Sequence, residues 1–179
     1  MKSSQLTFIC HAQTEAQRVG RFHRAEDGLH AAVEPQALPR ATTRILIAPE
    51  LRTRQTAAGL GLVGQLEPAL GDCDFGRWQG LPLKRLEQED PVGLQQWLSD
   101  AHATPHGGES LAQLCARVAR WMDEAPLAGH CVAVTHPLLI RAALLHVLEC
   151  PAQAFHGIDV LPLARVQFSR HGRWRLRVG

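Results

Sequence analysis

Two histidines, His11 and His136, each follow a short apolar run and have the clearest potential for chemistry in this chain. The runs before them, residues 6–10 and 131–135, are typical of strands that are buried on both faces of a sheet. In open α/β sheets, ligands bind in a crevice outside the carboxyl ends of the strands. The sequence therefore predicts that both imidazoles reach one crevice.

The same pattern predicts the elements that position these histidines. Near-continuous apolar strands indicate a three-layer α/β/α sandwich with a mostly parallel central sheet, in which the strands at residues 6–10 and 131–135 are neighbours. Residues 44–48 read as another buried strand, and Pro49 suits the first position of a following helix. Leu51, Gln55 and Ala58 would share one face of that helix.

Further helices and a terminal hairpin follow from local signals. Residues 82–101 predict two short helices, beginning at Leu83 and Pro91. Ser110 and Gln113 form a capping-box pattern. The helix that they begin has an apolar stripe of Leu111, Leu114, Cys115, Val118 and Met122. Alternating residues on both sides of His171 and Gly172 predict a hairpin whose arginines face solvent.

Length and composition exclude several classes of protein. With 179 residues, of which 45% are hydrophobic, we expect one domain over residues 1–179. A formal net charge of +2 argues against a dedicated nucleic-acid binder. No apolar run approaches the ~20 residues of a membrane span, and the N-terminus lacks a secretory pattern, so we expect a cytoplasmic protein. Five cysteines without a C-x-x-C pair favour reduced thiols.

Five segments carry a family resemblance: residues 10–14 (C-H-A-Q-T), 48–57 (A-P-E-L-R-T-R-Q-T-A), 72–80 (D-C-D-F-G-R-W-Q-G), 107–110 (G-G-E-S) and 132–136 (V-A-V-T-H). In that order they resemble motifs of the histidine phosphatase superfamily, which has the phosphoglycerate-mutase-like fold, in its short phosphatase branch. The first three family motifs read R-H-G-x-T, S-P-x-x-R-x-x-Q-T-A and E-x-x-F-G-x-W-E-G. The resemblance spans nearly the whole chain.

The resemblance implies a phosphoric monoester hydrolase that acts on a small phosphorylated molecule and uses no cofactor and no metal. His11 would take the phosphoryl group as a phosphohistidine. Arg52 would clamp the phosphoryl oxygens, and His136 would hydrogen-bond them. Asp72 stands where the family keeps a glutamate, the candidate proton donor to the leaving alkoxide. Gln17 stands where many members have a phosphate-contacting asparagine.

Three positions depart from the family pattern. Cys10 replaces an arginine, Ala12 replaces a glycine, and Asp72 is one methylene shorter than the family's glutamate. The loss of a phosphate-clamping arginine should reduce the rate by a factor on the order of 10²–10³. The arginines nearest in sequence that could supply the missing charge are Arg18, Arg21 and Arg54.

Three functions therefore stay open at the level of sequence. An active phosphatase is favoured over a degenerate, non-catalytic relative, or pseudoenzyme, that binds an anion or a partner protein. The third is a metal or thiol site at Cys10, His11, His136 and Cys73, although it lacks a ligand-spacing motif. Residues 81–106 are predicted to form the lid that chooses the substrate. His23 and the remaining histidines are expected to be structural or surface residues.

Overall fold

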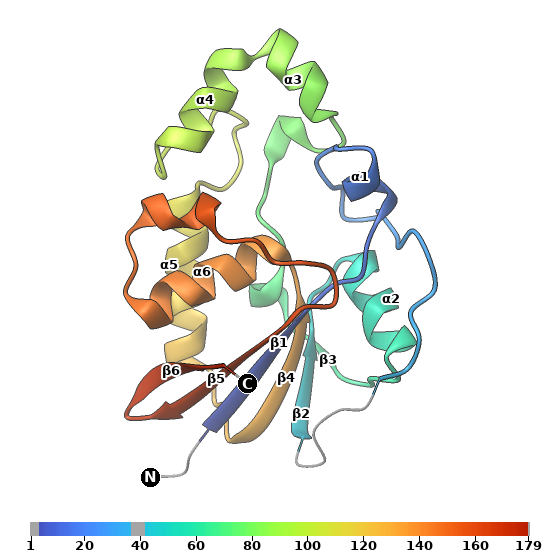
Figure 1. The fold of residues 1–179 in the computed structure, drawn as a ribbon, viewed down its shortest axis with the longest axis vertical. Helices are drawn as coiled ribbons and strands as arrows, with labels where there is room; N and C mark the ends of the chain where they lie inside the picture. The colour runs from blue at the N-terminus through green and yellow to red at the C-terminus, as the bar shows by residue number, and fades with distance from the viewer. Residues whose placement is uncertain (1–3, 37–41, 179) are drawn as a thin grey trace.

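In the computed structural model, which describes residues 4–36 and 42–178, a six-stranded sheet forms the centre of the molecule (Figure 1). The strand order is β3-β2-β4-β1-β5-β6. The strands run over Ser4–Cys10 (β1), Thr42–Ile47 (β2), Gln65–Leu66 (β3), Gly129–Thr135 (β4), Arg165–His171 (β5) and Arg173–Arg177 (β6). Strands β1 to β4 pair in parallel, whereas β5 is antiparallel to both β1 and β6, so the sheet is mixed.

The register between β1 and β4 brings the two histidines together. Strand β1 lies beside β4, as predicted, and Cys10 is paired with Thr135. His11 and His136 are the residues that directly follow β1 and β4, and the backbone N–H of His11 donates to the carbonyl of Thr135 at 2.9 Å. Parallel strands in this register place both imidazoles at the same edge of the sheet.

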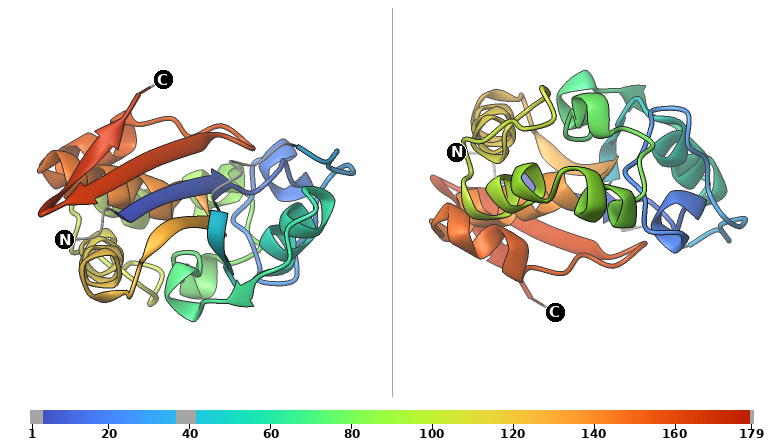
Figure 2. Two further views of the ribbon diagram at one scale, coloured as in Figure 1. Left: turned by 90° about the horizontal axis from the view of Figure 1, so that it is seen from below. Right: turned by 90° about the horizontal axis from the view of Figure 1, so that it is seen from above.

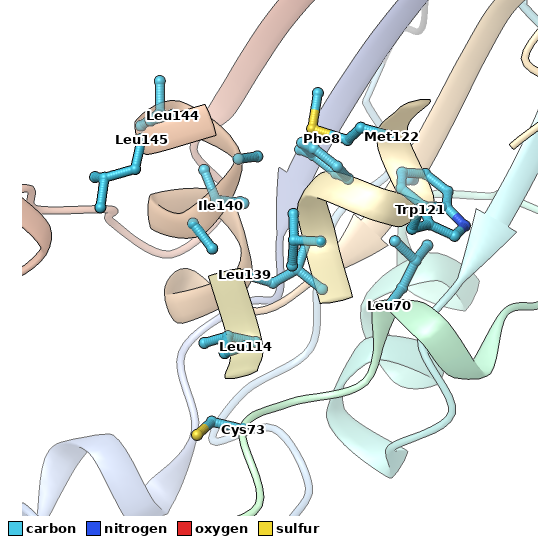
Figure 3. Packing of buried hydrophobic residues seen from close by; sticks show 14 of the residues in the cluster. Phe8, Leu70, Cys73, Leu114, Trp121, Met122, Leu139, Ile140, Leu144 and Leu145 are labelled. Atoms are coloured by element: carbon cyan, nitrogen blue, oxygen red, sulfur yellow. The ribbon is translucent and has the colours of Figure 1, made fainter. Parts of the chain in front are cut away.

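Helices cover both faces of the sheet. Helices α5 (Leu111–Glu124) and α6 (Pro137–Leu148) pack on one face through the larger core cluster, which includes Phe8, Leu114 and Ile140 (Figure 3). Helix α2 (Leu51–Gly59) packs on the other face through a smaller cluster with Ile9 and Val134. Successive residues of β1 point to opposite faces, so Phe8 and Ile9 belong to different clusters.

A pair of short helices lies beyond the carboxyl ends of the parallel strands (Figures 1 and 2). They are α3 (Leu83–Glu89) and α4 (Pro91–Ser99), and the prediction of two short helices here is confirmed. The shorter helical segments are α1 (Glu15–Arg18) and the 3₁₀ turns Pro68–Leu70, Gly76–Trp78 and Ala152–Gly157.

Local signals at two other elements are also confirmed. Ser110 and Gln113 form a reciprocal capping box at the start of α5, and Trp121 joins the expected buried stripe, whereas Cys115 is only half-buried. Strands β5 and β6 form the terminal hairpin, and Gly172 has the positive φ of 78° that the turn requires. Among the described residues, no helix has the length and apolarity that a bilayer crossing needs.

The prediction for α2 was wrong in its start. The helix begins at Leu51, with Glu50 as its N-cap, so Pro49 lies outside it. Its buried residues are Arg52, Thr53, Thr56 and Ala57, whereas Gln55 and Ala58 are exposed. An apolar pattern could not find this face, because the helix turns mostly polar side chains inward. Its hydroxyls bond to backbone groups: Thr53 donates to the carbonyl of Ala48 at 2.8 Å.

Candidate active site

His11 is fully buried and held in one orientation. Its Nδ1 lies 2.8 Å from the carbonyl oxygen of Ala12, and because a carbonyl can only accept, Nδ1 carries the hydrogen. The lone pair of the neutral ring is therefore on Nε2, which has no hydrogen-bond partner among the described residues. Burial, and then the charge of His136, lower the pKa of His11 to about 3. At neutral pH the ring is a neutral base with a free nucleophilic nitrogen.

Helix α2 fixes the loop that carries His11. The hydroxyl of Thr56 accepts a hydrogen bond from the backbone N–H of Ala12 at 3.0 Å and donates one to the carbonyl of Arg52 at 2.7 Å. The loop after β1 is thus tied to the same helical turn that carries Arg52. This tie explains why a polar face of α2 is turned inward.

Arg52 and Asp72 form a buried ion pair next to His11. The Arg52 side chain is 1% exposed, and its Nη2 lies 2.5 Å from Oδ2 of Asp72. Its Nη1 donates to the carbonyl of Arg24 at 2.9 Å, which aims the guanidinium. Burial alone would raise the pKa of Asp72, but the charges of His136 and Arg52 outweigh it and hold that pKa below its usual range. Asp72 is therefore an anion in the ligand-free site.

His136 lies between two carboxylates. Its ring centroid is 5.3 Å from that of His11, its Nε2 is 2.7 Å from Glu50, and its Nδ1 is 3.5 Å from Oδ2 of Asp72. Glu50 also accepts the backbone N–H of Asp72 at 2.9 Å. Burial would raise the pKa of Glu50, but the hydrogen bond and the charge of His136 together outweigh this effect, so the pKa lies below its ordinary value. Glu50 orients His136. The sequence did not reveal this role, because Glu50 stands at a position of the S-P-x-x-R motif that any residue can occupy.

His23, which was expected to be a structural or surface residue, is a third histidine beside His11. Its ring centroid is 5.5 Å from that of His11, and its Nε2 is 2.7 Å from the hydroxyl of Thr14. Burial, and then the charge of Arg52, lower its pKa to about 4. The His23 side chain lines a cavity of about 180 Å³, which Arg52 and Asp72 also line. It also lines an adjoining cavity of about 260 Å³. Its place in the sequence, twelve residues after His11, gave no periodic signal.

The structure does not bring Gln17 into this cluster through any described contact. Its side-chain oxygen accepts the backbone N–H of Thr14 at 3.0 Å and completes the capping box of α1. The carboxamide thus holds the turn that follows His11. A role for Gln17 in binding phosphate stays a prediction.

The three arginines suggested as substitutes for the family's lost one have no described contact with His11, Arg52 or Asp72. Arg18 is paired with Glu15 on the surface, Arg21 is paired with Asp27, and Arg54 is exposed. Instead, Arg141 on α6 is near enough to act electrostatically on Cys10.

Cys10 itself offers no charge to an anion. It is fully buried, and burial, helped by the negative charge of Asp72, raises the pKa of its thiol to about 12. The side chain is a neutral thiol at any physiological pH. Within residues 4–36 and 42–178, no three His, Cys, Asp or Glu side chains are grouped so that they could hold a metal ion.

Two of the recognised motifs support the loop that carries Asp72. Gly76 has a φ of 44°, and a Cβ there would collide with the carbonyl of His106. The backbone at Gly76 therefore packs directly against the start of the G-G-E-S motif. Glu109 of the second motif pairs with Arg117 of α5 at 2.8 Å. Arg117 also donates to the carbonyls of Ala69, Gly71 and Asp72.

This arrangement of His11, Arg52, His136 and Asp72 agrees with a comparison at the level of family. The chain matches the model of the histidine phosphatase superfamily (branch 1) over residues 6–178. The chain belongs to this superfamily. Its α/β fold, with a mixed central sheet flanked by helices, is that of the family's phosphoglycerate-mutase-like structures.

Relatives of this histidine phosphatase superfamily member are known from mycobacteria. It is 26% identical over 194 residues to the bifunctional protein Rv2228c of Mycobacterium tuberculosis, an alignment that covers 98% of this chain and 53% of that protein. The chain thus spans about half the length of that relative. It is also 26% identical over 211 residues to the glucosyl-3-phosphoglycerate phosphatase of the same species, and this alignment covers 99% of this chain and 95% of the phosphatase.

A solved structure extends the likeness to three dimensions. The mycobacterial glucosyl-3-phosphoglycerate phosphatase in complex with VO3 aligns with a TM-score of 0.78 and 26% identity, over 98% of each chain. The family and the fold are therefore shown for nearly the whole chain.

Proposed function

We propose that this protein hydrolyses a small phosphomonoester through a phosphohistidine intermediate on His11. The observation that carries the proposal is the free, buried Nε2 of His11, which has its lone pair available beside Arg52 and His136. A neutral imidazole is the form that can attack phosphorus. That a similar phosphatase structure holds VO3 supports an oxyanion as the ligand here.

In the first step, Nε2 of His11 forms a bond to phosphorus while the bond from phosphorus to the alkoxide oxygen breaks. Arg52 and His136 bind the phosphoryl oxygens and stabilise the charge that develops on them. The leaving alkoxide takes a proton from Asp72. In the second step, water attacks phosphorus and gives a proton to the Asp72 carboxylate, while the bond from phosphorus to Nε2 breaks. Inorganic phosphate leaves, and the neutral His11 and the protonated Asp72 are restored.

Substrate binding prepares Asp72 for this role. In the free site the electrostatic influence of His136 and Arg52 holds the pKa of Asp72 low. A bound phosphoryl group engages both residues and adds negative charge next to the carboxylate. Both changes raise the pKa of Asp72 and favour its protonated form, because the carboxylate loses the stabilisation by Arg52 and His136 and lies next to another anion.

One observation favours a second function, an anion-binding protein without turnover. The neutral thiol of Cys10 stands where the family has an arginine, so the site has less positive charge than an active member. Such a protein would bind phosphate through Arg52 without forming a phosphohistidine. The cytoplasmic location predicted from the sequence stays a prediction in either case.

Two measurements test the proposal. We expect the wild-type protein to release phosphate from members of a broad phosphomonoester panel and His11→Ala to release none above background. We expect titration calorimetry to show that Arg52→Ala weakens phosphate and vanadate binding at least about tenfold, the effect of losing one charged hydrogen-bonding group. Arg54→Ala, an exposed arginine two residues along α2, is the matched control and should bind like the wild type.

The outcomes separate the two functions. Equal anion binding by Arg52→Ala and Arg54→Ala would refute the phosphate site. Normal binding by the wild type without any turnover, or without acid-labile labelling of His11, would move the non-catalytic function ahead.

A further inference from the structure

An apolar cavity adjoins the candidate active site. It has a volume of about 260 Å³ and shares His23 and Asp72 with the neighbouring cavity of Arg52. Its walls are mainly apolar side chains: Phe22, Phe75, Leu83, Trp97, Pro137 and Leu138. A substrate whose phosphoryl group bound at Arg52 would have its leaving group next to this cavity.

The cavity walls are aromatic and firmly packed. The rings of Phe22 and Phe75 are 4.7 Å apart, and Trp97 lies 5.8 Å from Phe75 and 6.3 Å from Phe22. Phe75 and Trp97 are each less than a tenth exposed. Edge-to-face rings of this kind offer a flat slot for another ring or an alkyl chain.

The charges of the cavity do not suit an ionic leaving group. Among the described lining residues the basic side chains are Arg21, which Asp27 engages at 2.7 Å, and His23, whose pKa of about 4 leaves it neutral at pH 7. A carboxylate or a second phosphate in this cavity would lie beside the acidic side chain of Asp72 and would meet no uncommitted positive charge among the described lining residues. Burying such a group without a partner is costly.

We infer that the substrate is a phosphate monoester of a small, uncharged, apolar or aromatic alcohol, whose organic part occupies this cavity. The inference rests on the proposed function for the phosphate end of the ligand. The cavity is smaller than the ~300–1,000 Å³ typical of sites for drug-sized ligands, so the organic part is about one ring in size. Sugar and glycerate esters are disfavoured because their hydroxyl and carboxylate groups would lose hydration against aromatic walls.

The test compares two esters of primary alcohols, 2-phenylethyl phosphate and glycerol 3-phosphate, so that leaving-group chemistry differs little. We expect kcat/KM for the phenylethyl ester to exceed that for the glycerol ester at least about tenfold, from burial of the ring. Leu83→Glu should lower the phenylethyl value about tenfold and the glycerol value less, so that the ratio of the two values falls. Leu98→Glu is the matched control, because Leu98 is 46% exposed, like Leu83 at 40%, but does not line the cavity.

A binding arm keeps the inference testable without turnover. Calorimetry should show tighter binding of 2-phenylethylphosphonate than of methylphosphonate, and Leu83→Glu should remove the difference. If these phosphonates bind in that order but no ester is hydrolysed, hydrolysis fails and the assignment of the cavity stands. If glycerol 3-phosphate is the better substrate, or methylphosphonate binds as tightly as its phenylethyl analogue, the apolar assignment is overturned while the proposed hydrolysis stands.

Discussion

The carboxylate of Asp72 lies against Arg52 and His136, the two side chains that an incoming phosphate needs. Its Oδ2 is 2.5 Å from Arg52 and 3.5 Å from Nδ1 of His136, and both partners are buried. A phosphoryl group must therefore replace this carboxylate at Arg52 before His11 can react with it. The residue proposed to donate a proton is also an internal competitor for the anion.

Asp72→Asn separates these two roles. We expect inorganic phosphate to bind about tenfold more tightly, because the amide no longer competes as an anion next to Arg52. We also expect kcat for alkyl phosphates to fall by a factor on the order of 10²–10⁴, the usual contribution of a general acid. Titration calorimetry and steady-state kinetics measure the two effects, with exposed Asp100→Asn as the control. Weaker phosphate binding by Asp72→Asn would contradict the competition.

Cys10→Arg tests whether the missing arginine limits the rate. We expect kcat/KM to rise about tenfold, which corresponds to ~1.4 kcal/mol of transition-state stabilisation. We also expect the melting temperature to fall, because a larger side chain replaces a fully buried thiol. Cys10→Met, which adds bulk without charge, should lower the melting temperature and leave the rate unchanged. An unchanged rate in Cys10→Arg would show that another feature limits the protein.

At the level of elements, α5 supports the loop that presents Asp72. Arg117 pairs with Glu109 at 2.8 Å and donates to three carbonyls between residues 69 and 72. One guanidinium thus joins the helix, the G-G-E-S motif and the loop. The conformation of that loop depends on a residue that lies outside every recognised motif.

Arg117→Met should loosen this loop. We expect a loss of about 1–3 kcal/mol in the free energy of unfolding, because the carbonyls and the Glu109 carboxylate lose a charged donor. Turnover should fall as well, since Asp72 is no longer held in place. Urea denaturation and kinetics measure both, and Arg120→Met, an exposed arginine on the same helix, is the matched control. Equal effects of the two substitutions would show that Arg117 acts only as a surface residue.

For the whole molecule, the buried His11 and the half-buried His23 link stability to pH. The pKa of His11 is lowered to about 3 and that of His23 to about 4, against an ordinary value near 6.5 in the unfolded chain. Between the lowered and the ordinary pKa, the unfolded chain binds protons that the folded protein excludes. Stability therefore rises with pH in this window and is lost as the pH falls below about 6.5.

We expect the free energy of unfolding to decrease from pH 7 to pH 5 by up to about 1 kcal/mol per pH unit for each such histidine. His23→Gln should reduce this slope, whereas substitution of the exposed His102 by Gln should not. Urea denaturation at several pH values measures the slopes. The same slope in His23→Gln and wild type would show that His23 does not titrate in this way.

Sequence alone was sufficient wherever the signal is local or carried by a motif. The apolar runs before His11 and His136 predicted two neighbouring buried strands, since full burial on both faces demands continuous apolar side chains. The capping box at Ser110 and the terminal hairpin followed from residues near one another in the chain. The ordered motifs led to the superfamily, which the comparison confirmed.

Only the tertiary structure decided the groups that act across the fold. Glu50, His23 and Arg141 meet the site from a turn, a loop and a helix that lie far apart in sequence, and no spacing rule links them to His11. The polar inner face of α2 was missed for a related reason: its partners are backbone groups of other segments, so no apolar periodicity marks it. Burial, charge and the shape of the apolar cavity arise from side chains of many elements together, and they exist only once the chain has folded.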